Sequence, residues 1–227
     1  MKVSLLTTET IHHNFFIREI LKLDCDLSVF FETRKTSTFN YETYHPYEVE
    51  RDKYELNRWF NGSNIPTSQI CSVKKVENVN SNFAISLIKD SCPDLIIVFG
   101  TGLIKKKLLD LYPQKLINLH GGNPTKYRGL DSHLWTIYHK DFNNLITTLH
   151  KVDHGLDTGE IIIQSKIPLG SEDSLVTLRA KNTEVCISLC EYAINMYKKD
   201  KKFLSIPQLE RGRYYSAMPN VLKSICM

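Results

Sequence analysis

The sequence lacks long apolar runs and a strong excess of charge. Of its 227 residues, 42% are hydrophobic and 24% are charged, which is typical of a folded globular chain rather than a disordered one. No apolar stretch approaches the roughly 20 residues that a membrane-spanning helix needs, and the opening MKVSLLTTET has no small-residue cleavage site of a secretory signal. The formal net charge of +4 is small for a nucleic-acid-binding surface. We therefore expect a cytoplasmic protein without membrane or nucleic-acid partners.

The sequence also lacks the usual signs of disulfide and nucleophile chemistry. Its six cysteines form no C-x-x-C pair, and a chain of this length builds a core without disulfides, so we expect reduced, structural thiols. There is no G-x-S-x-G run, which excludes the interpretation of His120-Gly121-Gly122 as a lipase oxyanion loop. Cys92 precedes a predicted strand and so lies at the wrong edge of the sheet for a nucleophile. A covalent acyl-enzyme mechanism therefore has no candidate residue.

Predicted strands and helices alternate along most of the chain. The run Leu95–Phe99 is continuously apolar and bounded by Pro93 and Gly100, which favours a strand buried on both faces of a parallel sheet. Further elements are expected as strands at 2–6, 27–31, 69–73, 116–119, 145–152 and 161–167 and as helices at 11–23, 47–60, 83–89, 105–112, 131–138 (with Asp131 as N-cap) and 175–196. This order predicts an α/β fold with a largely parallel twisted sheet, an antiparallel edge and helices on both faces. We expect one core domain over residues 1–200 and a short tail or hairpin over 201–227.

Three loops at predicted strand ends are the places to look for a site, because open α/β sheets bind ligands beyond the carboxyl ends of their strands. Gly100-Thr101-Gly102 follows the first strand, and a second strand ends with Asn118 and His120, whose side chains point to the same side. The third loop runs from Asp153 to Gly159 and contains two glycines and two carboxylates. Each loop also has a simpler interpretation, as a tight turn, a structural histidine or a solvated turn.

Two ligand classes fit these loops poorly. A dinucleotide fingerprint needs a third glycine three residues after Gly102, but residue 105 is lysine. His150, Asp153, His154 and Asp157 are of metal-ligand type, but the glycines break the helical spacing that such pairs use, so we expect no metal. An amide, an imidazole and a carboxylate remain. This set suits acyl transfer by direct attack of an amine, with the oxyanion held by side chains.

The combined pattern resembles the formyltransferases that use 10-formyltetrahydrofolate. It consists of Asn118-x-His120, then Pro124-x-x-Tyr127-Arg128-Gly129, then His150 followed after five residues by Leu156-Asp157-Thr158-Gly159, and it covers about residues 94–168. The resemblance implies a Rossmann-like formyltransferase fold and an enzyme whose formyl donor is 10-formyltetrahydrofolate. Gly121-Gly122-Asn123 departs from the family's usual stretch at this point, which bears on the shape of the acceptor pocket.

The resemblance also assigns roles to residues. The family's catalytic asparagine, histidine and aspartate fall on Asn118, His120 and Asp157. By this similarity Asn118 and a protonated His120 would hold the oxyanion, while Asp157 would raise the pKa of His120 and orient its ring. The pterin ring would lie between two backbone segments, and the residues expected to bind the folate are Gly100, Gly102, Leu103, Ile104, His150, Val152, Asp153 and Gly155.

Within this family the preferred acceptor is a nucleotide-linked amino sugar, with dTDP-4-amino-4,6-dideoxyglucose as the first choice and a surface polysaccharide such as O-antigen or lipopolysaccharide as the destination. The loop Thr7–Thr10 has no glycine, unlike the phosphate loop of glycinamide ribonucleotide enzymes, which disfavours that substrate. Methionyl-tRNA enzymes carry a second domain after the long helix, but here only residues 197–227 follow it, which disfavours a tRNA. An N-terminal regulatory domain of the formyltetrahydrofolate hydrolase kind does not fit ahead of Lys2. The family likeness also suggests a homodimer formed through residues 204–215. Two alternatives stay open: formylation of another small amine such as glycinamide ribonucleotide, and a non-catalytic folate or nucleotide-sugar binder.

Overall fold

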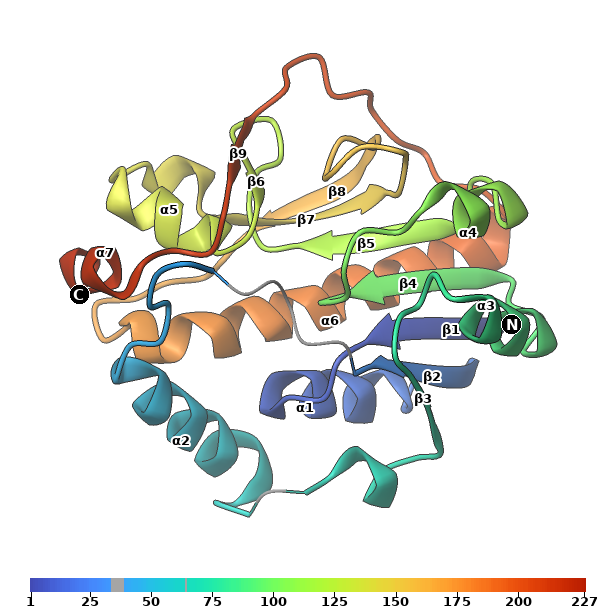
Figure 1. The fold of residues 1–227 in the computed structure, drawn as a ribbon, viewed down its shortest axis with the longest axis horizontal. Helices are drawn as coiled ribbons and strands as arrows, with labels where there is room; N and C mark the ends of the chain where they lie inside the picture. Colours follow the sequence, from blue (N-terminus) through green and yellow to red (C-terminus); the bar gives the residue numbers. More distant parts are fainter. Residues whose placement is uncertain (34–38, 64) are drawn as a thin grey trace.

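A central sheet organises the chain, as Figure 1 shows for a computed structural model that describes residues 1–33, 39–63 and 65–227. Within this described part, seven strands pair in the order β3-β2-β1-β4-β5-β7-β8. Their bounds are β1 Lys2–Thr7, β2 Asp26–Glu32, β3 Val73–Val76, β4 Leu95–Phe99, β5 Leu116–His120, β7 Ile146–Lys151 and β8 Ile161–Lys166. The first five strands in this order are parallel, while β7 is antiparallel to β5 and β8 to β7. The predicted α/β class, parallel sheet and antiparallel edge are confirmed.

Helices cover both faces of this sheet. Their bounds are α1 Ile11–Ile20, α2 Tyr47–Phe60, α3 Asn82–Asp90, α4 Lys106–Leu111, α5 Ser132–Tyr138, α6 Leu175–Asp200 and α7 Asn220–Ile225, with short 3₁₀ turns at Thr67–Gln69 and Phe142–Asn144. Helices α1 and α6 share one hydrophobic cluster with the sheet, and α3 and α4 share another. The fold therefore has three layers, with the sheet in the middle.

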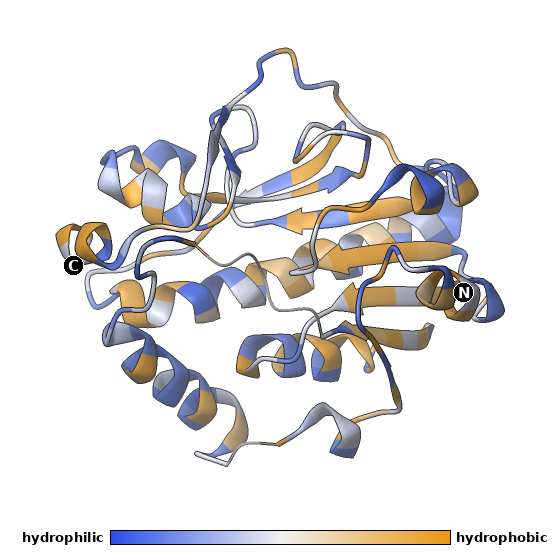
Figure 2. Ribbon diagram, viewed as in Figure 1, coloured by the Kyte–Doolittle hydropathy of each residue, from blue (hydrophilic) through white to orange (hydrophobic). Residues whose placement is uncertain are grey.

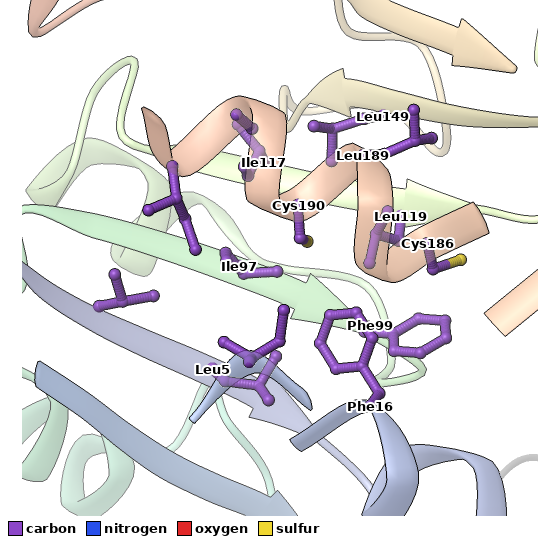
Figure 3. Packing of buried hydrophobic residues seen from close by; sticks show 14 of the residues in the cluster. Leu5, Phe16, Ile97, Phe99, Ile117, Leu119, Leu149, Cys186, Leu189 and Cys190 are labelled. Carbon is purple, nitrogen blue, oxygen red and sulfur yellow. The ribbon is translucent and has the colours of Figure 1, made fainter. Parts of the chain in front are cut away.

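Strand β4 explains why the core has two halves. All five of its side chains are buried, and because side chains of a strand alternate between faces, Ile97 and Phe99 pack with α6 while Ile96 and Val98 pack against α3 and α4. Figure 3 shows the first of these clusters, in which Cys190 of α6 lies over the strands. Figure 2 shows the same distribution along the whole chain, with the apolar residues concentrated in the strands and on the inward helix faces.

One local prediction was wrong, and another is confirmed in position only. The strand expected at 69–73 lies later, at Val73–Val76, and is preceded by a 3₁₀ turn. The apolar residues that suggested the earlier start, Ile70 and Cys71, pack onto the core from outside the sheet. Asp131 does precede α5, but it has a left-handed backbone and makes no side-chain cap. Its carboxylate instead accepts the backbone N–H of Met218 at 2.8 Å, so it ties α5 to the C-terminal segment.

The C-terminal segment returns to the body of the molecule instead of forming a hairpin with itself. Strand β9 (Arg213–Tyr215) pairs in parallel with β6 (Tyr127–Gly129) as a separate two-stranded sheet. In Figure 1 the chain leaves α6, arches over β7 and β8, and descends beside β6 to α7. The boundary at residue 200 and a role in dimerisation stay predictions.

The cysteines and the helices bear on two further expectations. All six cysteines are free thiols, of which Cys186 and Cys190 are buried and Cys92 is exposed. Of the helices in the ranges 1–33, 39–63 and 65–227, none has both the length and the apolar character needed to cross a bilayer.

Candidate functional site

The predicted catalytic residues meet at the carboxyl end of β5. Asn118 and His120 lie two residues apart on this strand, and the pairing with β7 places His150 directly across from Asn118. Asp157 lies in the loop after β7 and has a left-handed φ of 53°. The Nδ2 group of Asn118 donates to Oδ1 of Asp157 at 3.4 Å and to Nε2 of His150 at 3.1 Å. Four residues that the sequence singled out therefore form one cluster.

The carboxylate of Asp157 links three segments of chain. Its Oδ2 accepts the backbone N–H of Gly129 at 2.8 Å and lies 3.5 Å from Nδ1 of His120. Burial by itself would raise the pKa of this carboxyl group, but the neighbouring His120 and His150 and the N–H of Gly129 outweigh burial and lower the pKa to about 2. Asp157 is therefore ionised throughout the physiological pH range.

His120 is held by the backbone of β6. Its Nε2–H donates to the carbonyl oxygen of Tyr127 at 2.8 Å, since a carbonyl can only accept. In a neutral ring this bond leaves Nδ1 without a proton and facing Asp157. The expectation of a raised pKa was wrong: desolvation in this buried position lowers the pKa of His120, and the opposing effect of Asp157 does not compensate. Burial and the carboxylate of Asp157 therefore act in opposite directions on the pKa of His120, and burial has the larger effect.

A small cavity lies on one side of this cluster. Its volume is about 80 Å³, and it is lined by Asn118 and Asp157 together with the loops after β4 and β7. Seven of the eight residues expected to bind folate line it, namely Gly102, Leu103, Ile104, His150, Val152, Asp153 and Gly155. The eighth, Gly100, lines the larger cavity instead.

A larger cavity, of about 720 Å³, borders the same cluster. It shares Asn118 and Asp157 with the small cavity, and His120 also lines it. The two cavities share six lining residues, Thr101, Gly102, Leu103, Asn118, Leu156 and Asp157. Shared walls of this kind suit a site that brings two substrates together.

Several residues on the wall of the larger cavity carried little signal in the sequence. They include His12, His13, Tyr47, Arg51, His133, Arg179, Asn182 and Tyr214. In the sequence alone, His12-His13 and the segment from Tyr44 to Phe60 could contact a nucleotide, but a capped helix start and a solvated helix face are the simpler interpretations. Arg179 and Asn182 interrupt the apolar face of α6, and that interruption was the one available signal. His133 had none, because its place depends on how α5 packs beside β5.

Metal ligands are not clustered in this site. Across residues 1–33, 39–63 and 65–227, no three His, Cys, Asp or Glu side chains are arranged to hold a metal ion. His150 donates through Nδ1 to the carbonyl oxygen of Lys151 at 2.7 Å, and Asp153 binds the backbone N–H of Gly155 and the hydroxyl of Thr158. The polar groups of this loop therefore fix its shape.

Comparisons with known proteins agree with the geometry. A family model described as formyl transferase matches residues 53–189, which include β5, β6, β7 and all three predicted catalytic residues. A methionyl-tRNA formyltransferase from Porphyromonas gingivalis is 27% identical over 152 residues, which make up 66% of this chain and 46% of that protein. The chain thus spans less than half the length of this relative.

Two solved structures share the fold. One is the formyltransferase PseJ from Anoxybacillus kamchatkensis in complex with UDP-4,6-dideoxy-4-formamido-L-AltNAc and tetrahydrofolate. It is 20% identical with a TM-score of 0.58, covering 95% of this chain and 86% of that one. The other is a phosphoribosylglycinamide formyltransferase from Bacillus halodurans, which is 18% identical with a TM-score of 0.60, covering 89% of this chain and 97% of that one.

Proposed function

Because this chain belongs to the formyl transferase family, we propose that it moves a formyl group from 10-formyltetrahydrofolate to the amine of a nucleotide-linked amino sugar. One observation carries the proposal: Asn118 and Asp157 are among the residues that line both cavities. The small cavity, walled by the backbone of two loops, would take the pterin of the folate. The larger cavity would take the acceptor.

The geometry gives each of the three residues a part in the reaction. The acceptor amine attacks the formyl carbon, and the Nδ2 group of Asn118 donates a hydrogen bond to the oxygen that gains negative charge. The proton that leaves the amine passes to Nδ1 of His120, where the carboxylate of Asp157 stabilises the resulting imidazolium from 3.5 Å. As the bond between the formyl carbon and N10 breaks, that proton is returned to N10. The products are a formamide and tetrahydrofolate, and His120 is neutral again.

The size and lining of the larger cavity support a small-molecule acceptor. A volume of about 720 Å³ lies within the ordinary range of ligand pockets. Its wall has aromatic rings on which a base can stack, from Tyr47 and Tyr214, and the guanidinium of Arg51, which could serve a phosphate. Arg179, also on this wall, already donates to Glu55 and Asp52. The complex named for PseJ contains a nucleotide-linked sugar of this kind, which supports the same acceptor class here.

A panel of acceptors tests the proposal. The purified protein is incubated with 10-formyltetrahydrofolate and, separately, with dTDP-, UDP- and GDP-linked 4-amino sugars, glycinamide ribonucleotide and methionyl-tRNA, and the products are identified by mass spectrometry. We expect a gain of one formyl group on an amino sugar nucleotide. Formylation of glycinamide ribonucleotide or methionyl-tRNA alone would overturn the sugar assignment, and the absence of any formyl amide would favour a non-catalytic binder.

The protonation state of His120 predicts the pH dependence. Because burial lowers the pKa of His120 below its ordinary value of 6.5, the neutral ring predominates above that pH. We expect kcat/KM for the folate, measured at saturating acceptor, to be flat from pH 6.5 to 8. It should then fall at lower pH as the ring gains a proton. The His120→Asn variant should lose this acid limb. A rate that instead increases as the pH is lowered from 8 to 6 would identify the protonated ring as the active form.

The position of Asp157 depends on Gly129, which predicts the effect of a methyl group there. Gly129 has a φ of +96°, and an alanine Cβ would lie 2.2 Å from the carbonyl oxygen of Tyr215. In Gly129→Ala, β6 must shift and its hydrogen bond to Asp157 must lengthen, so we expect turnover to fall by about tenfold. Gly170→Ala is the matched control, because its Cβ would meet only Oδ2 of Asp173 at 3.8 Å. Equal turnover in the two variants would show that β6 does not position the carboxylate.

A further inference from the structure

His133 lies on the wall of the larger cavity, on α5. Its Nε2–H donates to the carbonyl oxygen of Ile146 at 2.8 Å, and this bond fixes the direction of the ring. The opposite nitrogen, Nδ1, makes no hydrogen bond to any residue that the structure describes. Burial lowers the pKa of His133 to about 4. The ring is therefore neutral at physiological pH, and Nδ1 carries a lone pair that can only accept.

Gly121 makes room for this ring, and Gly122 makes room for Ser132 at the start of α5 and for the ring of His120. A Cβ on Gly121 would lie 3.0 Å from Cε1 and 3.3 Å from Nδ1 of His133, and a Cβ on Gly122 would lie 2.7 Å from Cβ of Ser132. Side chains at both positions would push the start of α5 away from the end of β5. These are the residues at which the sequence departs from the family pattern, so the departure and the position of His133 are connected by packing.

The position of Nδ1 of His133 next to the reacting groups suggests which part of the substrate it binds. Gly121, against which the ring packs, directly follows His120 in the chain. The amine that attacks must be neutral and has N–H groups, and a sugar acceptor also carries hydroxyl groups beside it. A neutral imidazole with an unprotonated nitrogen accepts a hydrogen bond from such a group. A protonated ring could only donate, and its charge would repel an ammonium group.

We propose that Nδ1 of His133 accepts a hydrogen bond from an N–H or O–H group of the acceptor substrate, and that Gly121 and Gly122 permit this contact. The inference rests on the proposed function, since it assigns an acceptor contact within the larger cavity. It makes His133 an acceptor-binding residue with no part in binding the folate.

Two amide substitutions separate this role from a structural one. The amide of asparagine ends near the position of Nδ1, while that of glutamine ends near Nε2. His133→Gln therefore keeps a donor for the carbonyl of Ile146 but loses the group that faces the acceptor, and His133→Asn does the reverse. With dTDP-4-amino-4,6-dideoxyglucose, or the UDP-linked 4-amino sugar if that alone is formylated, we expect His133→Gln to lower kcat/KM for the acceptor by about tenfold. His133→Asn should lower kcat/KM for the acceptor less than His133→Gln does, and KM for the folate should not change in either variant.

The kinetic pattern identifies the donor group and can refute the proposal. An effect on KM for the acceptor alone indicates a hydroxyl group, and an effect on kcat indicates the reacting amine. Wild-type kinetics in His133→Gln, or a loss of activity confined to His133→Asn, would show that the ring serves only to anchor α5.

If both variants unfold, Gly121→Ala provides the test, because it keeps the imidazole but displaces it. Unchanged acceptor kinetics in that variant would overturn the proposal. An inactive wild-type protein overturns the proposed function as well, whereas an active one with an unaffected His133→Gln overturns this inference alone.

Discussion

Replacement of Asp157 by asparagine is expected to lower kcat by about 10²–10³-fold, the loss typical of removing a preorganised group from an oxyanion site. The carboxylate accepts from two opposite directions, from Nδ2 of Asn118 and from the N–H of Gly129. An asparagine can accept on only one of these sides, so its NH₂ group must face another donor. The variant also removes the negative charge that stabilises a proton on His120. Because the side chain keeps its size, KM for the folate should change little.

Asp173→Asn provides the matched control for this experiment. Asp173 also accepts a backbone N–H, from Gly170 at 2.6 Å, but it lies at the start of α6, outside the residues that line the two cavities. We expect its kcat to remain within about twofold of wild type, since a substitution away from the reacting groups removes no transition-state contact. Both rates are measured at saturating folate and acceptor. A kcat for Asp157→Asn that matches the control would mean that the carboxylate is not part of the catalytic machinery.

Replacement of Arg179 by methionine is expected to destabilise the protein by about 3–5 kcal/mol, the cost of leaving a buried charge without its partner. Nε and Nη2 of Arg179 donate to the two oxygens of Glu55, at 2.7 and 2.6 Å, and Glu55 is fully buried. This pair joins α6 to α2. The free energy of unfolding is measured by urea denaturation at pH 8.

A second, solvent-exposed ion pair between α2 and α6 provides the control. Arg58 of α2 makes a similar bidentate pair with Glu184 of α6, at 2.7 and 3.1 Å. Both side chains of this pair are more than one-third exposed. We expect Arg58→Met to cost less than about 1 kcal/mol. Equal losses in the two variants would contradict the assignment of the difference to burial.

Acidification should reduce the effect of the Arg179 substitution. Burial raises the pKa of the Glu55 carboxyl even with Arg179 in place, and removal of the arginine must raise it further. Below the pKa of the unfolded chain, Glu55 is protonated in both states and the buried group costs little. As the pH increases above that value, only the unfolded chain releases its proton, so the variant loses stability relative to wild type. The gap between Arg179→Met and wild type should therefore be smaller at pH 5 than at pH 8.

The sequence was most informative where a local pattern has one structural outcome. The apolar run of β4 could be buried only in the centre of a sheet, and the two-residue spacing of Asn118 and His120 required them to share a side of a strand. The loop around Asp157 was recognisable through its order relative to those residues. These features predicted the sheet, its antiparallel edge and the cluster at the end of β5.

The remaining features depend on packing between distant segments. The lowered pKa of His120 results from burial beneath β6, whose backbone also takes its Nε2–H. Asp131 meets the expectations for a helix cap in sequence, but the C-terminal segment competes for its carboxylate through Met218. His133 and Arg179 both line the larger cavity, and the neighbouring Leu134 of α5 shares a hydrophobic cluster with Leu175 and Leu178 of α6. Contacts between segments so far apart in the chain cannot be predicted from the spacing of residues within one segment.

The pairing of β6 with β9 affects the order in which parts of the structure form during synthesis on the ribosome. Gly129 holds Asp157, yet it is itself paired with Tyr215, and Arg128 donates both to the carbonyl of Gly212 and to that of Leu156 in the Asp157 loop. Asn118, His120 and Asp157 are all synthesised well before β9. The nascent chain can thus form its sheet and bury its core while the cluster at the end of β5 still lacks the support of β9. The cluster at the end of β5 is then completed late in synthesis, when the segment around Tyr215 has left the exit tunnel and docked.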